Sequence, residues 1–303
     1  MLPKRAGFVL AVCLFLFSFC VSIGFTQSHE QEFALPPLEM GETLLNMGQL
    51  EPAQAIFSRL FETQAEDAYV VRGLVKSLAG MNKLEKAREQ LEAYLKDHPE
   101  SSAVLYGMGL IHLMERKTGP AEEFLNKAIS IDPANAPALN TLAVSLYERK
   151  EYQAAIDRLH QAVEKSPGDL LVYRNLWRTY AAMDKTALFH KEFEQARQEN
   201  ATPRILGYGR AYAGSLRQQG FKEYQAGNLD GAYMKMKTML EVYRDIKYSS
   251  GEVSALFSLG LLEEERGNKS SALDLYRTLL KISPNHIQGR ERLQALEQDI
   301  KNQ

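Results

Sequence analysis

The side chains that most often carry chemistry are few in this sequence and lie far apart. Six histidines are spread over 303 residues, and no two of them are four residues apart, the spacing that puts two metal ligands on one helix face. No phosphate-binding glycine loop, H-E-x-x-H segment or nucleophile elbow is present. His112 lies in a strongly apolar stretch, which favours a packed core histidine. We therefore expect no catalytic residue, no metal site and no cofactor.

The N-terminal segment has the order of a secretory signal. Lys4 and Arg5 precede a nearly unbroken apolar run, which ends near Gly24. This order predicts a signal peptide in residues 1–24, or a signal anchor if the segment is not cleaved. In either case the rest of the chain is exported and is periplasmic, or membrane-anchored and facing the extracytoplasmic side. Residues 25–33 would form a linker.

Cysteine usage and charge exclude several classes of protein. Both cysteines, Cys13 and Cys20, lie inside the N-terminal segment, so the rest of the chain cannot form a disulfide or a thiolate metal site. Lipidation of Cys20 is disfavoured because Phe19 precedes it, where lipoproteins have a small residue. The 36 basic and 38 acidic residues give a net charge of −2, which does not favour nucleic acid as a partner.

The middle of the chain repeats itself at a fixed interval. Pro99, Pro133 and Pro167 are 34 residues apart, and apolar residues recur between them at helical spacing, so each period predicts two amphipathic helices. Small residues share one offset, twelve residues before each proline: Ala87, Ala121 and Ala155.

This pattern resembles the tetratricopeptide repeat (TPR), in which small residues at repeat positions 8 and 20 let two helices pack closely. The resemblance implies an all-α fold, a right-handed α-solenoid of helix–turn–helix repeats closed by a C-terminal capping helix. Glycines at the turns between helices fit the same interpretation. Seven units begin at Ala34, Ala68, Ser102, Ala136, Leu170, Ala213 and Val253.

The repeat pattern weakens in the second half of the chain. In the unit from Leu170, Trp177 and Phe189 stand where the family has small residues. Farther on, Ala232 and Ala272 are 40 residues apart, six more than the period, which predicts a longer connection.

The domain organisation follows from these units. We expect a TPR array of about five repeats, the last degenerate, over 34–200 and a second array of two repeats over 213–285. A break or linker is expected at 201–212, where Pro203 and two glycines occur. Residues 286–303 are expected to form the capping helix.

The resemblance also implies a binding surface. In the family, ligands contact the first helix of each repeat at positions 2, 5, 9 and 12, and tyrosine and arginine are residue types that anchor interfaces. These positions favour a mixed aromatic and basic groove for an extended or helical peptide, the alternative being ordinary solvated helix faces. The predicted groove residues are Tyr69, Arg72, Lys76, Tyr106, Asn140, Tyr147, Arg174, Arg178, Arg217 and Tyr224.

One known use of such a groove does not fit. Chaperone-binding TPR domains hold a terminal carboxylate with a clamp of basic and asparagine residues. Here Arg72 fits the clamp, but Lys76 and Gly107 replace its asparagines, and Pro137 and Thr141 replace its basic pair. A chaperone-adaptor role is therefore disfavoured.

The sequence predicts a non-catalytic scaffold of the cell envelope, an assembly or tethering factor that binds other proteins through the concave TPR surface. The alternative is an accessory subunit of an envelope polysaccharide-export or polymer-processing system. A membrane contact is expected only through the N-terminal segment if it is not cleaved, and no contact with nucleic acid is expected.

Overall fold

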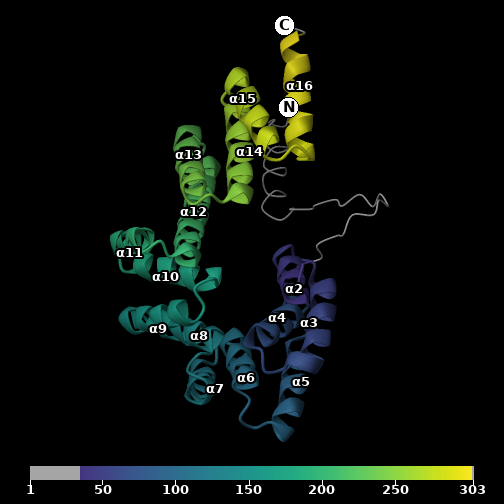
Figure 1. Cartoon of the computed structure of the whole chain (residues 1–303), viewed down its shortest axis with the longest axis vertical. Helices are drawn as coiled ribbons and strands as arrows, with labels where there is room; N and C mark the ends of the chain where they lie inside the picture. The colour runs from purple at the N-terminus through teal and green to yellow at the C-terminus, as the bar shows by residue number, and fades with distance from the viewer. Residues whose placement is uncertain (1–34, 302–303) are drawn as a thin grey trace. The chain divides into compact units, whose positions relative to one another are not determined.

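The computed structural model describes residues 35–301, and within that span every regular element is an α-helix. The helices form two compact units, which divide between Lys165 and Ser166 (Figure 1). The first unit contains α2 (Pro37–Asn46), α3 (Leu50–Gln64), α4 (Ala68–Gly80), α5 (Leu84–Asp97), α6 (Ser102–Met114), α7 (Thr118–Ile131), α8 (Ala136–Glu148) and α9 (Tyr152–Lys165). The second contains α10 (Leu170–Ala182), α11 (Thr186–Gln198), α12 (Thr202–Gln225), α13 (Leu229–Asp245), α14 (Ser249–Glu265), α15 (Lys269–Ile282) and α16 (Ile287–Lys301).

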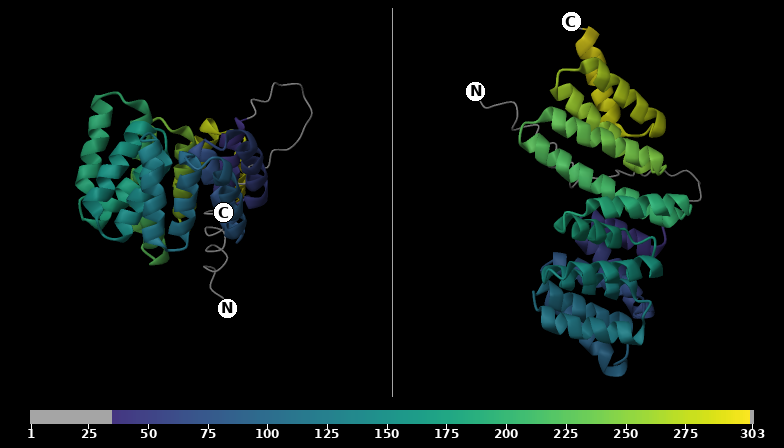
Figure 2. Two further views of the ribbon diagram at one scale, coloured as in Figure 1. Left: turned by 90° about the horizontal axis from the view of Figure 1, so that it is seen from below. Right: turned by 90° about the vertical axis from the view of Figure 1, so that its left-hand side faces the viewer.

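The helices of the first unit pack as consecutive hairpins, α2 with α3 through α8 with α9 (Figure 2). A small residue lies at each crossing and lets the two helices approach closely. An apolar side chain four residues later, one turn along the same helix, fills the space beside it. The small residues, all fully buried at predicted position 20, are Ala53, Ala87, Ala121 and Ala155, and the large ones are Phe57, Leu91, Leu125 and Leu159.

Four repeats begin at the residues that the sequence predicts, with α4 at Ala68, α6 at Ser102, α8 at Ala136 and α10 at Leu170. A side-chain oxygen just before the helix accepts a hydrogen bond from a backbone N–H of the first turn, which supplies a partner that the helix itself cannot provide. The start of α10 is capped in the same way. The four capping residues, again 34 apart, are Asp67, Ser101, Asn135 and Asp169.

The turns between paired helices require a left-handed backbone. Gly48 has φ of 74° and Gly227 has φ of 79°, as expected for glycines at this position. Asn82, Arg116 and Lys150 occupy the same turn position with φ of 58°, 59° and 65°. Because an L residue pays roughly 1–2 kcal/mol for this conformation, these turns retain strain that glycine would remove.

Aromatic rings replace small residues in the α10–α11 hairpin. Phe189 is fully buried, and its ring centroid lies 5.1 Å from that of Trp177 and 5.0 Å from that of Tyr208, both edge-on. On α12, Gly207 leaves room for another ring of this hairpin, since a Cβ there would lie 2.2 Å from the ring of Tyr173. The two bulky residues that weaken the repeat pattern are therefore part of a packed core.

The predicted break at 201–212 was wrong. These residues lead into and form the first half of α12, one continuous helix of 24 residues. Pro203 lies in the first turn, where its missing N–H costs nothing. Gly209 brings α12 close to the end of α13, since a Cβ there would lie 2.6 Å from Ile246.

The longer connection expected between Ala232 and Ala272 is also absent. The helices themselves are longer, since α13 and α14 have 17 residues each against 13 or 14 for α4 and α5. The last helix, α16, packs on α15 with Leu296 buried and forms the predicted cap. Among residues 35–301, no helix combines the length and apolarity needed to cross a membrane. The predicted signal in residues 1–24 lies outside the described residues.

Candidate functional site

Helix α4 carries three of the predicted groove residues on one face. Tyr69, Arg72 and Lys76 are three and four residues apart and half-buried. The guanidinium of Arg72 lies 4.6 Å from the ring centroid of Tyr69, and its Nη2 is 2.8 Å from Oε1 of Glu42 on α2. Glu42 therefore offsets part of the positive charge on this face.

Two other predicted groove residues are buried. Tyr106 on α6 is 1% exposed, and Asn140 on α8 is 3% exposed. Helix α6 packs against α4, α5, α7 and α8, so all its residues from Ser102 to Ile111 are buried. This placement corrects the expectation that Tyr106 and Asn140 face a partner. Tyr147 is half-buried near the end of α8, with its ring centroid 5.4 Å from that of Tyr152.

In the second unit the predicted residues lie on two helices that pack together, α10 and α12. Arg174 and Arg178 are one turn apart on α10, and Arg217 and Tyr224 are two turns apart on α12. All three arginines are exposed. The hydroxyl of Tyr224 donates a hydrogen bond to Glu265 at 3.0 Å.

Further residues gather around Arg174 and Arg217. Arg210 precedes Arg217 by seven residues, which places the two on the same face of α12. Its guanidinium lies 4.8 Å from the ring centroid of Tyr248, and that ring is 5.7 Å from the ring of Tyr243 at the end of α13. Arg210 was missed because nearby glycines indicated a linker. A helical assignment of 202–225 would have placed it beside Arg217. We name the arginine–tyrosine cluster for Arg174, Arg210, Arg217, Tyr243 and Tyr248.

The charges of all three arginines of the cluster act on Tyr243. Burial raises the pKa of its hydroxyl, while the charges of Arg217, Arg210 and Arg174 oppose that rise. The pKa of Arg174 is lowered, first because surrounding protein displaces water and then because Arg217 and Arg210 repel its charge. Arg174 is still exposed to water, so the surrounding protein removes only part of its hydration.

Within residues 35–301, no carboxylate pairs with Arg174, Arg210 or Arg217. By contrast, Arg266 in the same unit contacts two carboxylates, at 2.6 and 2.9 Å. Gly214 lies between Arg210 and Arg217 on α12, and a Cβ there would meet no atom within 4 Å. The cluster therefore concentrates positive charge beside an open stretch of helix backbone.

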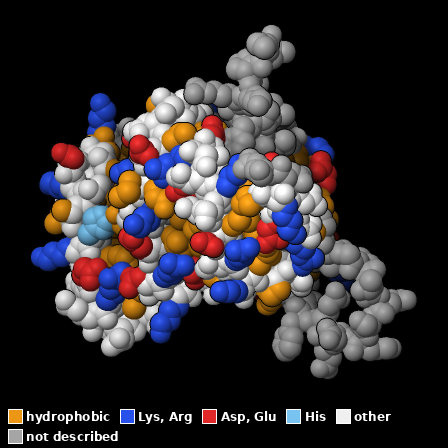
Figure 3. All heavy atoms as spheres, turned by 90° about the horizontal axis from the view of Figure 1, so that it is seen from above, with side chains coloured by type: hydrophobic (Ala, Val, Ile, Leu, Met, Phe, Trp, Pro, Cys, Tyr) orange, Lys and Arg blue, Asp and Glu red, His pale blue; other side chains and the backbone are white. Residues whose placement is uncertain are grey.

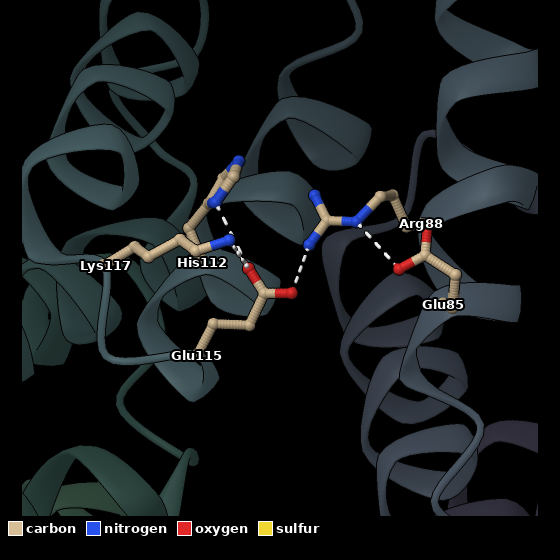
Figure 4. A network of polar contacts seen from close by, with 5 residues as sticks. All are labelled: Glu85, Arg88, His112, Glu115 and Lys117. Atoms are coloured by element: carbon tan, nitrogen blue, oxygen red, sulfur yellow. Dashed lines mark hydrogen bonds and ion pairs between the residues drawn. The ribbon is translucent and has the colours of Figure 1, made fainter.

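A second polar group surrounds Glu115 in the first unit (Figure 4). Its carboxylate accepts a hydrogen bond from Arg88 at 2.5 Å and lies 3.1 Å from Nζ of Lys117. Nδ1 of His112 is 3.5 Å from the same carboxylate, and its ring stacks on Phe124 at 5.4 Å. Burial, followed by the charge of Arg88, lowers the pKa of His112. The ring is therefore neutral near pH 7, as a packed structural histidine requires.

Residues 35–301 contain no group of three or more histidine, cysteine, aspartate or glutamate side chains suited to holding a metal ion.

Comparison with known families agrees with the repeating hairpins. Three family models described as tetratricopeptide repeat match residues 72–136, 112–176 and 254–286. The chain is a tetratricopeptide-repeat protein. The matches fall in both units of this TPR protein. The first two overlap over residues 112–136 and together extend from α4 into α10.

Two curated proteins are similar to parts of the TPR chain. Type IV pilus assembly protein PilF of Pseudomonas aeruginosa is 30% identical over 139 residues, which cover 45% of this chain and 54% of PilF. Protein O-mannosyl-transferase TMTC3 of Homo sapiens is 23% identical over 253 residues, which cover 80% of this chain and 25% of TMTC3. The chain thus spans about half of one relative and a quarter of the other.

A solved structure has a similar fold. The crystal structure of the APC/C hetero-tetramer Cut9–Hcn1 matches with a TM-score of 0.52 at 17% identity, over 86% of this chain and 55% of that one. At this identity the likeness concerns the fold alone.

Proposed function

We propose that this TPR protein is a non-catalytic scaffold that binds other proteins. The observation that carries the proposal is the arginine–tyrosine cluster, an accessible group of interface-forming side chains on packed repeat helices. Arginine and tyrosine are enriched among residues that dominate binding energy, and stacked TPR hairpins are suited to presenting them to a protein partner.

We further propose that the scaffold works in the cell envelope, as an assembly or tethering factor of a multi-protein complex. Two observations support this location. Residues 1–24 have the charge and apolar order of an export signal, and a relative of part of the chain is named as a pilus assembly protein.

Affinity capture from detergent-solubilised envelope tests the binding function. The tagged full-length protein should recover a stoichiometric partner. The comparison is made with the double variant Arg174→Ala and Arg217→Ala. Both side chains are exposed, so their truncation leaves the core intact. If the wild-type protein recovers only the background of an untagged strain, the scaffold proposal fails.

The location is tested separately by fractionation and by mass spectrometry of the mature N-terminus. We expect either cleavage after Gly24 with the protein in the periplasmic fraction, or an intact chain in the membrane fraction. An intact, unprocessed chain in the cytoplasmic fraction would contradict the envelope proposal.

A further inference from the structure

We propose that the arginine–tyrosine cluster is the docking site for an acidic segment of a partner protein, whose side-chain carboxylates pair with Arg174, Arg210 and Arg217. This inference rests on the proposed scaffold function and names the chemistry of the partner. Three of the five cluster residues, Arg210, Tyr243 and Tyr248, lie outside the groove positions that the repeat pattern predicts.

The three arginines of the cluster carry uncompensated positive charge. Arg174 projects from α10, while Arg210 and Arg217 project from one face of α12, the helix against which α10 packs. No carboxylate among residues 35–301 neutralises the three. Arg217 and Arg210 repel the charge of Arg174, around which protein has displaced part of the water. An entering anion relieves this repulsion, and the planar guanidinium matches a carboxylate through two parallel hydrogen bonds.

The two tyrosines of the cluster are positioned to assist carboxylate binding. Among the described residues none forms a hydrogen bond with the hydroxyl of Tyr243, so it can donate to a carboxylate held by the surrounding arginines. The ring of Tyr248 contacts the guanidinium of Arg210 at 4.8 Å. That contact holds Arg210 in place and reduces the entropy lost when a partner binds.

The helix backbone between Arg210 and Arg217 is accessible to a peptide. Gly214 lies one turn after Arg210 and just under one turn before Arg217, and it is half-exposed with open space where a side chain would stand. Gly in a helix interior costs about 0.5–1 kcal/mol relative to Ala. The open backbone at this point lets a peptide approach between the arginines.

The surroundings favour an acidic peptide over nucleic acid or an anionic membrane. The chain has a net charge of −2 and a pI near 6.3, and acidic and basic side chains are interspersed on the face that Figure 3 shows. Nucleic acid and anionic lipid surfaces select extended basic patches. A local group of three arginines instead matches a few neighbouring carboxylates.

Fluorescence anisotropy with the full-length protein tests the inference. The probe is a labelled peptide of alternating glutamate and alanine with one phenylalanine, and its matched analogue has glutamine in place of glutamate. Both carry an amidated C-terminus, so only side-chain carboxylates are compared. We expect the glutamate peptide to bind at least about tenfold more tightly, and added salt to weaken it.

Charge-removing variants locate the site. Arg174→Gln and Arg217→Gln should each weaken binding about tenfold, the effect of losing one charge-assisted hydrogen bond. Arg59→Gln is the matched control, because Arg59 is an exposed arginine on α3 in the other unit. It should leave the affinity unchanged.

A variant that fills the open space on α12 tests the effect of access on binding separately from the effect of charge. Gly214→Gln keeps all three arginines but fills the open space on α12, so it should also weaken binding about tenfold. It should not lower the melting temperature, since glutamine is a better helix former than glycine. Loss of binding in a fully folded variant assigns the effect to the open space beside Gly214.

Several results would overturn the inference. One is equal affinity for the two peptides, and another is wild-type affinity in Arg174→Gln and Arg217→Gln. A third is binding of oligothymidine or phosphatidylglycerol vesicles that is tighter than binding of the glutamate peptide. If the capture experiment recovers a partner that Arg174→Ala and Arg217→Ala do not release, the scaffold stands and this docking site fails. If no partner is recovered at all, the scaffold proposal itself fails.

Discussion

The α8–α9 and α10–α11 hairpins meet the same packing requirement in opposite ways. Repeat position 20 is Ala155 in the first and Phe189 in the second, and both are fully buried. The first hairpin uses a small residue to bring its helices together. The second fills its crossing with the ring of Phe189, which packs edge-on against Trp177 and Tyr208. On the next helix, Gly207 leaves room for the neighbouring ring of Tyr173. The repeat thus requires a total volume at the crossing rather than a particular residue.

The first unit also contains a ring packed against a glycine. A Cβ on Gly73 would lie 2.1 Å from the ring of Phe57, although Ala53 keeps position 20 small in that repeat. Large and small residues can therefore exchange places between neighbouring helices as long as they remain complementary. Mutations at the two versions of position 20 test this conclusion most directly.

The largest effect is expected from Phe189→Ala. Removing a fully buried ring leaves a cavity that costs about 3–5 kcal/mol in the free energy of unfolding. Trp177, the single tryptophan of the chain, lies 5.1 Å away, so its fluorescence during urea denaturation reports the loss. Leu188→Ala is the control, because Leu188 is 44% exposed. Similar costs for the two variants would contradict the packing described here.

The reverse change in the first unit should cost less. Ala155→Leu overfills the α8–α9 crossing and should lower the free energy of unfolding by about 1–3 kcal/mol, measured by circular dichroism in urea. Ala154→Leu makes the same substitution on the exposed neighbour and should have little effect. If the two variants unfold alike, the assignment of position 20 is in error.

A pH dependence should appear in both units. Burial is the first cause that lowers the pKa of His112, His190 and His286, so the unfolded chain, with an ordinary pKa near 6.5, binds protons first as the pH falls. The stabilisation from neutral histidine is therefore present above about pH 6.5 and is lost at lower pH. The melting temperature should drop between pH 8 and pH 5.5.

His190→Gln isolates the contribution of the second unit to this pH dependence. The His190 ring lies 5.7 Å from Trp177, so the variant should reduce the pH-dependent change seen by tryptophan fluorescence. An unchanged pH profile at Trp177 would show that His190 does not contribute.

The smallest effects are expected at the turns. Lys150→Gly should stabilise the α8–α9 turn by about 0.5–1 kcal/mol, because relief of the left-handed strain exceeds the extra chain entropy of glycine. Gly227→Ala in the second unit should destabilise by a similar amount, since Gly227 has φ of 79°. Thermal melts of both variants check the pair, and shifts of the same sign would contradict the turn assignment.

The regular repeats could be predicted from sequence because several local signals agree there. Asp67, Ser101 and Asn135 cap helices where the 34-residue period requires a helix to start, and the prolines fall between helices. Propensity, capping and apolar spacing therefore lead to the same boundaries.

The rest depended on tertiary contacts that no local signal reveals. Gly207 and Gly209 indicate a break when read locally, yet they are the points where rings and Ile246 approach α12. Tyr106 occupies a groove position in the repeat pattern, but helices on several sides bury it. Arg210 joins the candidate site only once residues 202–225 are known to form one helix.

The length of α12 affects how the second unit unfolds. Its first half supplies Tyr208 to the aromatic core with Phe189, and its second half holds Gly220 against Met236 of α13. One continuous helix thus belongs to two hairpins at once. In repeat arrays, by contrast, unfolding is ordinarily coupled only through the contacts between neighbouring repeats. Heating should therefore disassemble the region from α10 to α13 in a single concerted transition.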